Sequence, residues 1–208
     1  MIRIEQQLDE EIEWRIFELA MLKTNHLSRS ISENRANIIR KYSVIAIYAL
    51  FEGYVVRVFD IYKENINKLN LKCSEINTKI LTSYVNYKHK LTNGKSDVIK
   101  QEQFILNLQE IILSTSLNID MKINTESNVN MKVLNKLLFS FNLKSINDNE
   151  LESRLNKLLK FRNSLAHGET VLRVTNELVC EFVETVTILM DLVSEIIVIG
   201  YKDRTYLR

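Results

Sequence analysis

Apolar residues recur at helical spacing in the first third of the chain. Within residues 4–25 they are Leu8, Ile12, Ile16, Leu19 and Leu22. Acidic residues occupy the other faces of this segment, so the pattern predicts an amphipathic outer helix. The next segment, residues 32–70, begins at Ser32, a residue type that caps helices. It becomes apolar on every side between residues 44 and 59, which predicts a central, buried helix.

Aromatic side chains are spaced along this predicted central helix. They are Tyr48, Phe51, Tyr54, Phe59 and Tyr62. Exposed rings could stack on nucleic-acid bases, but in so apolar a helix we expect them to pack in the core.

The pattern weakens in the middle of the chain and returns near residue 147. Short helical patterns cover residues 104–113 and 129–138, with polar stretches between them. We expect residues 71–146 to form a variable insertion of short helices and loops within a single domain spanning residues 1–208. A helix is predicted from residue 147 to His167, ending at Gly168, because glycine readily takes the left-handed conformation that follows many helices. A last helix is predicted from residue 175 or 176 to about residue 199.

The composition favours an all-α helical bundle. The 208 residues include no proline and four glycines, and 46% are hydrophobic, so the usual breakers of helices are almost absent. Cys73 and Cys180 are far apart and have no second cysteine or histidine at metal-binding spacing. We therefore expect no disulfide, no zinc site and no cofactor. His26 and His89 have no evident partners and are expected at the surface.

Neither of the most apolar stretches predicts a membrane span. Residues 44–51 are too few to cross a bilayer, and residues 186–199 are interrupted by Asp191 and Glu195. The N-terminus becomes acidic by Glu13, which is the wrong order for a signal peptide. We expect a cytoplasmic protein that does not bind a membrane.

Basic residues cluster toward the end of the predicted 147–167 helix, although the formal net charge is only +2. Between residues 153 and 173 the cations are Arg154, Lys157, Lys160, Arg162 and Arg173, opposed only by Glu169. The first three keep to one side of the helix. They are equally consistent with a track that binds the RNA backbone and with an ordinary solvated face.

Arg162 falls in the middle of an apolar stripe on this helix. The stripe contains Leu151, Leu155, Leu158, Leu165 and Ala166. A guanidinium there is costly unless it is paired, so Arg162 requires either a carboxylate or an edge where the stripe meets solvent and ligand. Glu52 is likewise an isolated charge on an apolar face of the central helix, with no basic residue three or four positions away. We predict that Glu52 and Arg162 form a bidentate ion pair.

Two further polar residues lie near Arg162. Asn163 and His167 are four residues apart and share a polar flank of the helix, so they can act together. Arg162 and His167 are five residues apart and point about 140° away from each other on a helical wheel. A long arginine can reach around a shared groove, and the groove can also be assembled from two copies of the helix.

These residues resemble a known family. The run at residues 158–169 is LLKFRNSLAHGE, which resembles the Arg-x4-6-His signature of the HEPN superfamily (higher eukaryotes and prokaryotes nucleotide-binding domains). The run at residues 47–54, IYALFEGY, resembles the aromatic-Glu-Gly-aromatic pattern in the second helix of a bacterial HEPN branch. Residues 71–146 contribute nothing specific to the resemblance.

The resemblance implies a helical bundle that dimerises so that two motifs face each other and form one metal-independent ribonuclease site. It also implies that the polar residue after the arginine, here Asn163, assists catalysis. Many family members are toxins or antiviral effectors held in check by an antitoxin or regulatory protein. Some carry a tyrosine that a partner modifies two residues after the histidine, where this chain has Glu169, so control by that modification is not expected.

The residue types suit metal-free RNA cleavage. His167 can exchange protons near neutral pH, and Arg162 can hold the phosphate and stabilise its extra charge. Glu52 would support Arg162, and Arg154, Lys157 and Lys160 would bind RNA. The alternative is a catalytically silent HEPN-like module that binds a protein partner or a nucleotide.

Overall fold

The computed structural model describes residues 3–28, 31–89, 98–113, 116–168 and 173–208. Its helices are α1 (Ile4–Thr24), α2 (Glu33–Asn67), the short 3-10 helix η1 (Cys73–Glu75), α3 (Thr78–His89), α4 (Val98–Leu113), α5 (Met131–Ser140), α6 (Asn149–Ala166) and α7 (Asn176–Lys202). In these ranges the only β pairing is an isolated bridge between Ile76 and Leu207. The predicted all-α class is confirmed.

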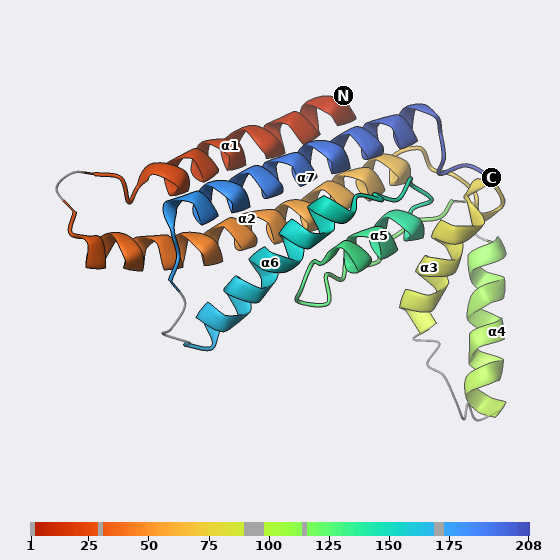
Figure 1. Ribbon diagram of the computed structural model, residues 1–208. Helices are drawn as coiled ribbons and strands as arrows, with labels where there is room; N and C mark the ends of the chain where they lie inside the picture. The colour runs from red at the N-terminus through yellow and green to blue at the C-terminus, as the bar shows by residue number, and fades with distance from the viewer. Residues whose placement is uncertain (1–2, 29–30, 90–97, 114–115, 169–172) are drawn as a thin grey trace.

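The bundle is built on α2, which spans about 50 Å if its 35 residues are regular helix. Helices α1 and α7 run along it, and α6 crosses it obliquely (Figure 1). The five aromatic residues predicted for the core, from Tyr48 to Tyr62, are each at most 1% exposed. They fill the centre of the bundle because α2 is covered by helices on several sides.

Local capping explains where the later helices begin and end. The side chain of Asp148 accepts a hydrogen bond from the backbone N–H of Leu151 at the start of α6, and Thr175 does the same for Leu178 in α7. Helix α6 ends at Ala166, and Gly168 has the left-handed φ of 78° that its residue type predicted. Ser32 occupies the N-cap position of α2, but its side chain makes no capping hydrogen bond.

The segment predicted to be a variable insertion contributes to the central core. Its buried apolar residues include Ile80, Ile119, Val129, Leu134 and Phe141, which belong to the same hydrophobic cluster as α2. Helix α3 was not predicted, because its polar and β-branched residues give a weak helical pattern. Helix α4 was predicted six residues too short.

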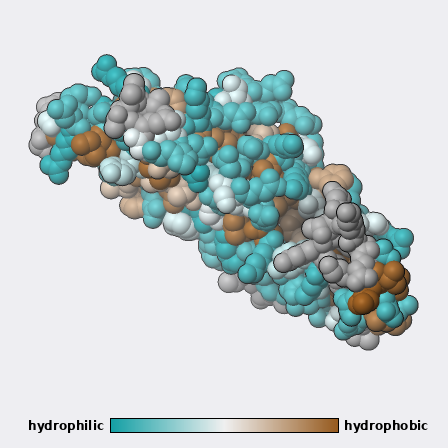
Figure 2. Space-filling view, turned by 90° about the horizontal axis from the view of Figure 1, so that it is seen from below, coloured by the Kyte–Doolittle hydropathy of each residue, from teal (hydrophilic) through white to brown (hydrophobic). Residues whose placement is uncertain are grey.

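Helices α3 and α4 project from one end of the bundle (Figure 1). Helix α4 exposes large apolar side chains at Val98, Ile105, Leu106, Ile112 and Leu113. Figure 2 shows a corresponding hydrophobic area at that end of the molecule. None of the described helices combines the length and the apolar character that a membrane crossing requires.

The prediction that His26 lies at the surface is wrong. Its side chain is 4% exposed, and its Nε2 lies 2.8 Å from Oδ1 of Asn176 at the start of α7. The histidine is buried because the chain leaving α1 folds back against α7. The side chain of His89 lies outside the described residues. Cys73 and Cys180 are both free thiols.

Candidate functional site

Helix α6 carries Arg162 to the edge of the core, where the apolar stripe meets solvent. Leu155 and Leu158 are fully buried against the bundle. Leu165 is only half-buried and Ala166 is exposed, so the stripe was predicted one turn too long. The reason is that the last turn of α6 extends beyond the helices that cover its start (Figure 1). Arg162 therefore keeps 26% of its side chain exposed.

The predicted pairing of Arg162 with Glu52 is confirmed, although its geometry differs. Nη2 of Arg162 lies 4.0 Å from Oε2 of Glu52, and the Glu52 side chain is 25% exposed. At this distance the contact is a charge attraction and is too long for a hydrogen bond. The predicted bidentate arrangement is wrong, so the guanidinium keeps N–H groups that the carboxylate does not occupy.

Three other side chains hold this pair. The guanidinium of Arg162 lies over the ring of Tyr48, 4.4 Å from its centroid, and its Nη1 donates a 2.8 Å hydrogen bond to Oδ1 of Asn163. On the other side of the pair, the hydroxyl of Thr125 donates a 2.8 Å hydrogen bond to Oε1 of Glu52. Arg162 is thus fixed at the core edge by an aromatic face, an amide and a carboxylate.

Tyr48 and Thr125 were missed as site residues by the sequence reasoning. Tyr48 belongs to the IYALFEGY run, so a signal for it was present, but it was assigned to the core alone. Thr125 lies 73 residues from Glu52 in the chain, in a segment with no recognisable motif. Only the tertiary structure brings it to the site.

The ring of Tyr48 supports the guanidinium of Arg162, and its hydroxyl stays protonated. Burial raises the pKa of its hydroxyl above the ordinary value, and the neighbouring Glu52 carboxylate acts in the same direction. The backbone N–H of Val129, which donates to the Tyr48 oxygen at 2.8 Å, and the charge of Arg162 lower that pKa but do not offset the rise. Because the phenol stays protonated near neutral pH, Tyr48 cannot act as the general base.

His167 lies immediately after the last turn of α6, with its side chain exposed. Its backbone N–H donates a 3.0 Å hydrogen bond to the carbonyl oxygen of Asn163. Asn163 therefore contacts both candidates, through its side chain to Arg162 and through its carbonyl to His167. Within the described part of the chain, the imidazole of His167 has no hydrogen bond or ion pair and is open to a ligand or a second copy.

The basic residues proposed to bind RNA differ in their availability. Arg154 donates a 2.8 Å hydrogen bond to Glu184, and Lys157 donates one of the same length to Glu181. These bonds join α6 to α7. Lys160 is exposed and, among the described residues, has no ion-pair partner. A role in RNA binding stays a prediction for all three, and Arg154 and Lys157 would have to exchange their acidic partners for phosphate.

Comparison with known proteins identifies the family. The model of the MAE_28990-like HEPN family matches residues 4–206. The chain therefore belongs to the HEPN superfamily, and the match also spans residues 71–146. No curated protein and no solved structure matches the chain significantly. No group of three or more His, Cys, Asp or Glu side chains with the geometry to hold a metal ion occurs in the described ranges.

Proposed function

We propose that this protein is a metal-independent endoribonuclease in which His167 transfers protons and Arg162 holds the phosphate. HEPN domains are generally of the ribonuclease type. The observation that carries the proposal is the position of Arg162 at the core edge. Its guanidinium is held there by Glu52 at 4.0 Å and Tyr48 at 4.4 Å, and an exposed histidine follows five residues later in the chain. A purely structural arginine would be expected to satisfy its N–H groups within the core.

The reaction follows from the chemistry of these two groups. Neutral His167 takes the proton of an RNA 2′-hydroxyl, and the oxygen forms a bond to the adjacent phosphorus. The bond from phosphorus to the 5′-oxygen breaks, and an imidazolium donates a proton to that oxygen. The products are a 2′,3′-cyclic phosphate and a 5′-hydroxyl. Arg162 donates hydrogen bonds to the phosphate oxygens, which carry extra negative charge in the transition state. Asn163 keeps the guanidinium in place.

We expect the protein to act as a homodimer whose interface includes the end of α6. A single motif with side chains about 140° apart makes a poor pocket, whereas a two-fold axis beside it brings two histidines and two arginines together. One imidazole can then act as base while the other acts as acid. Light scattering at micromolar concentration should give twice the 24.4 kDa chain mass. A strict monomer that cleaves RNA would contradict the composite site.

The biological setting is part of the same proposal. We infer a toxin or antiviral effector of the cytoplasm whose activity is held in check by an antitoxin or regulatory protein. Cleavage of cellular or foreign RNA must be restrained in a living cell, which is why such a partner is expected. Co-purification of a small protein encoded beside this chain would support this setting.

The direct test is cleavage of mixed RNA by purified protein, followed on a gel with and without a metal chelator. We expect cleavage in both cases and products that end in a 2′,3′-cyclic phosphate. Loss of activity with chelator would contradict the metal-independent mechanism. No cleavage under any condition would instead favour the silent module that binds a protein or nucleotide.

A further inference from the structure

A tight turn at residues 124–129 contacts both groups that support Arg162. The hydroxyl of Thr125 donates to Oε1 of Glu52 at 2.8 Å, and the backbone N–H of Val129 donates to the hydroxyl of Tyr48 at 2.8 Å. The turn therefore holds the carboxylate beside the guanidinium and the aromatic ring beneath it. It belongs to neither of the two sequence motifs of the site.

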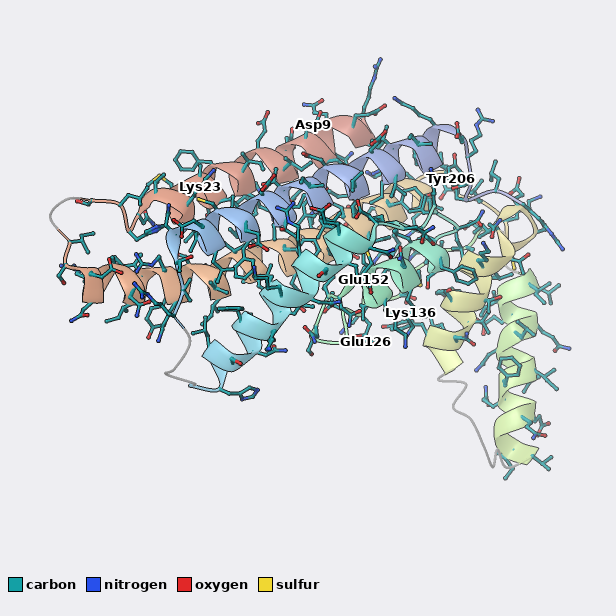
Figure 3. All side chains as sticks on the ribbon, in the orientation of Figure 1. Asp9, Lys23, Glu126, Lys136, Glu152 and Tyr206 are labelled. Atoms are coloured by element: carbon teal, nitrogen blue, oxygen red, sulfur yellow. The ribbon has the colours of Figure 1, made fainter. Side chains whose placement is uncertain are left out.

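Hydrogen bonds within the turn and an ion pair to α5 stabilise it. The side chain of Asn124 accepts a 2.9 Å hydrogen bond from the backbone N–H of Glu126, and the backbone N–H of Asn128 donates one of 3.0 Å to the carbonyl of Thr125. Glu126 also pairs with Lys136 of α5, and both are labelled in Figure 3. Val129 is completely buried, which anchors the end of the turn in the core.

The backbone of the turn supports a specific positioning role. Glu126 and Ser127 have φ values of 52° and 57°, so two neighbouring residues other than glycine adopt the left-handed conformation. That conformation is uncommon for such residues and persists only where the surrounding structure enforces it. Two such residues directly after Thr125 indicate that contacts with the rest of the protein hold this turn in place.

Glu52 is engaged by Thr125 and does not form a bidentate pair with Arg162. A carboxylate that faces a guanidinium can form two parallel N–H···O bonds with it. Here Oε1 is engaged by Thr125, and Oε2 remains 4.0 Å from Nη2 of Arg162. The carboxylate is near enough to orient the cation, but it leaves N–H groups free for a phosphate.

We propose that Thr125 is a positioning residue that holds Glu52 back from Arg162 and so keeps the guanidinium available to the RNA phosphate. This rests on the proposed ribonuclease function. Without the hydroxyl, Glu52 turns toward Arg162 and closes a bidentate pair. The closed pair neutralises the cation and occupies the N–H groups that would stabilise the transition state. Thr125 itself touches neither the phosphate nor the proton in transit.

The test is Thr125→Val, which keeps the shape of the side chain and removes the hydroxyl. We expect kcat to fall about tenfold to a hundredfold, the range for losing one charge-assisted hydrogen bond to the transition state. The melting temperature should not fall, because the closed ion pair replaces the lost hydrogen bond. Thr125→Ser, which restores the hydroxyl, should recover most of the rate. Thr185→Val is the matched control, since the Thr185 hydroxyl donates only to a backbone carbonyl, that of Glu181.

A double variant separates this role from a general loss of structure. In Glu52→Gln there is no carboxylate to release, so adding Thr125→Val should change kcat by less than about twofold, because the two substitutions act through one contact. If the two effects multiply, or if Thr125→Val cleaves at the wild-type rate, the proposal is wrong.

A readout that needs no catalysis keeps this test separate from that of the ribonuclease function. Nuclear magnetic resonance of the arginine side chains, with the Arg162 signals assigned from Arg162→Lys, reports how freely the guanidinium rotates. We expect slower guanidinium rotation and better resolved Nη signals in Thr125→Val than in the wild type and the double variant, because the closed pair adds two hydrogen bonds to the one that Asn163 already accepts. If the wild type cleaves no RNA but these signals behave as expected, the ribonuclease proposal fails and the role of Thr125 in positioning stands. Identical signals in all variants would overturn that role.

Discussion

Replacing either Arg162 or His167 by alanine is expected to remove RNA cleavage while leaving the fold intact. Loss of a general acid–base group typically costs about 10²–10⁴ in rate, and loss of a group that stabilises transition-state charge costs about as much. His167 lies after the end of α6 with an exposed side chain, so its removal should change the free energy of unfolding by less than about 0.5 kcal/mol. Cleavage assays combined with circular dichroism measure both quantities.

The variant Lys160→Ala separates RNA binding from the proposed reaction. Lys160 is exposed on the same helix, two residues before Arg162, and removing it lowers the local charge without touching the proposed reaction. Its kcat should stay close to that of the wild type, with at most a modest rise in KM and a weaker dependence on salt. Wild-type cleavage by His167→Ala or Arg162→Ala would show that the site assignment is wrong. If cell toxicity accompanies cleavage, both variants should lose it.

Replacing Glu52 by glutamine is expected to reduce both stability and activity, although Glu52 moves no proton. The substitution removes the charge that orients Arg162. Complete burial of the pair would predict a loss of about 3–5 kcal/mol. Each side chain keeps about a quarter of its surface exposed and the charges are 4.0 Å apart, so we expect about 1–2 kcal/mol. For a chain of this size that is a fall of roughly 2–8 °C in the melting temperature.

The activity of Glu52→Gln should fall at least about tenfold, because a guanidinium that is no longer held loses its alignment with the phosphate. Glu64→Gln is the control. Glu64 lies on the same helix and pairs with Arg57 at 3.1 Å, but it is 46% exposed and distant in sequence from the motif. An exposed pair of this kind contributes little, so both readouts should stay near those of the wild type. Equal behaviour of the two variants would mean that Glu52 is an ordinary surface partner.

Much of the bundle could be predicted from the sequence, because the periodicity of a helix and the residues at its ends are local features of the chain. The periodic apolar residues predicted the C-terminal end of α1 to within one residue. The run of apolar residues identified α2 as the buried centre of the bundle. Gly168 marked the end of α6 because its conformation is determined by its own residue type. The pairing of Glu52 with Arg162 could also be inferred, since each was an isolated charge on an apolar face.

The predictions from sequence were wrong where burial or helix formation depends on contacts with distant segments of the chain. His26 was expected at the surface, because nothing near it in the chain indicates that Asn176 covers it. Helix α3 has a weak pattern of its own and is set by packing, since Ile80 within it is completely buried. The apolar stripe of α6 was extended to Ala166 because a helical wheel does not show where the neighbouring helices stop.

The division between sequence and tertiary structure is clearest at the site. The sequence by itself identified the candidate residues for the chemistry, because Arg162 and Asn163 lie in the last turns of α6 and His167 directly follows that helix. Only the tertiary structure decided how Arg162 is held, because Thr125 reaches Glu52 from 73 residues away. Helical periodicity is a local property of the chain, whereas a hydrogen bond between two loops or helices depends on how the whole core packs.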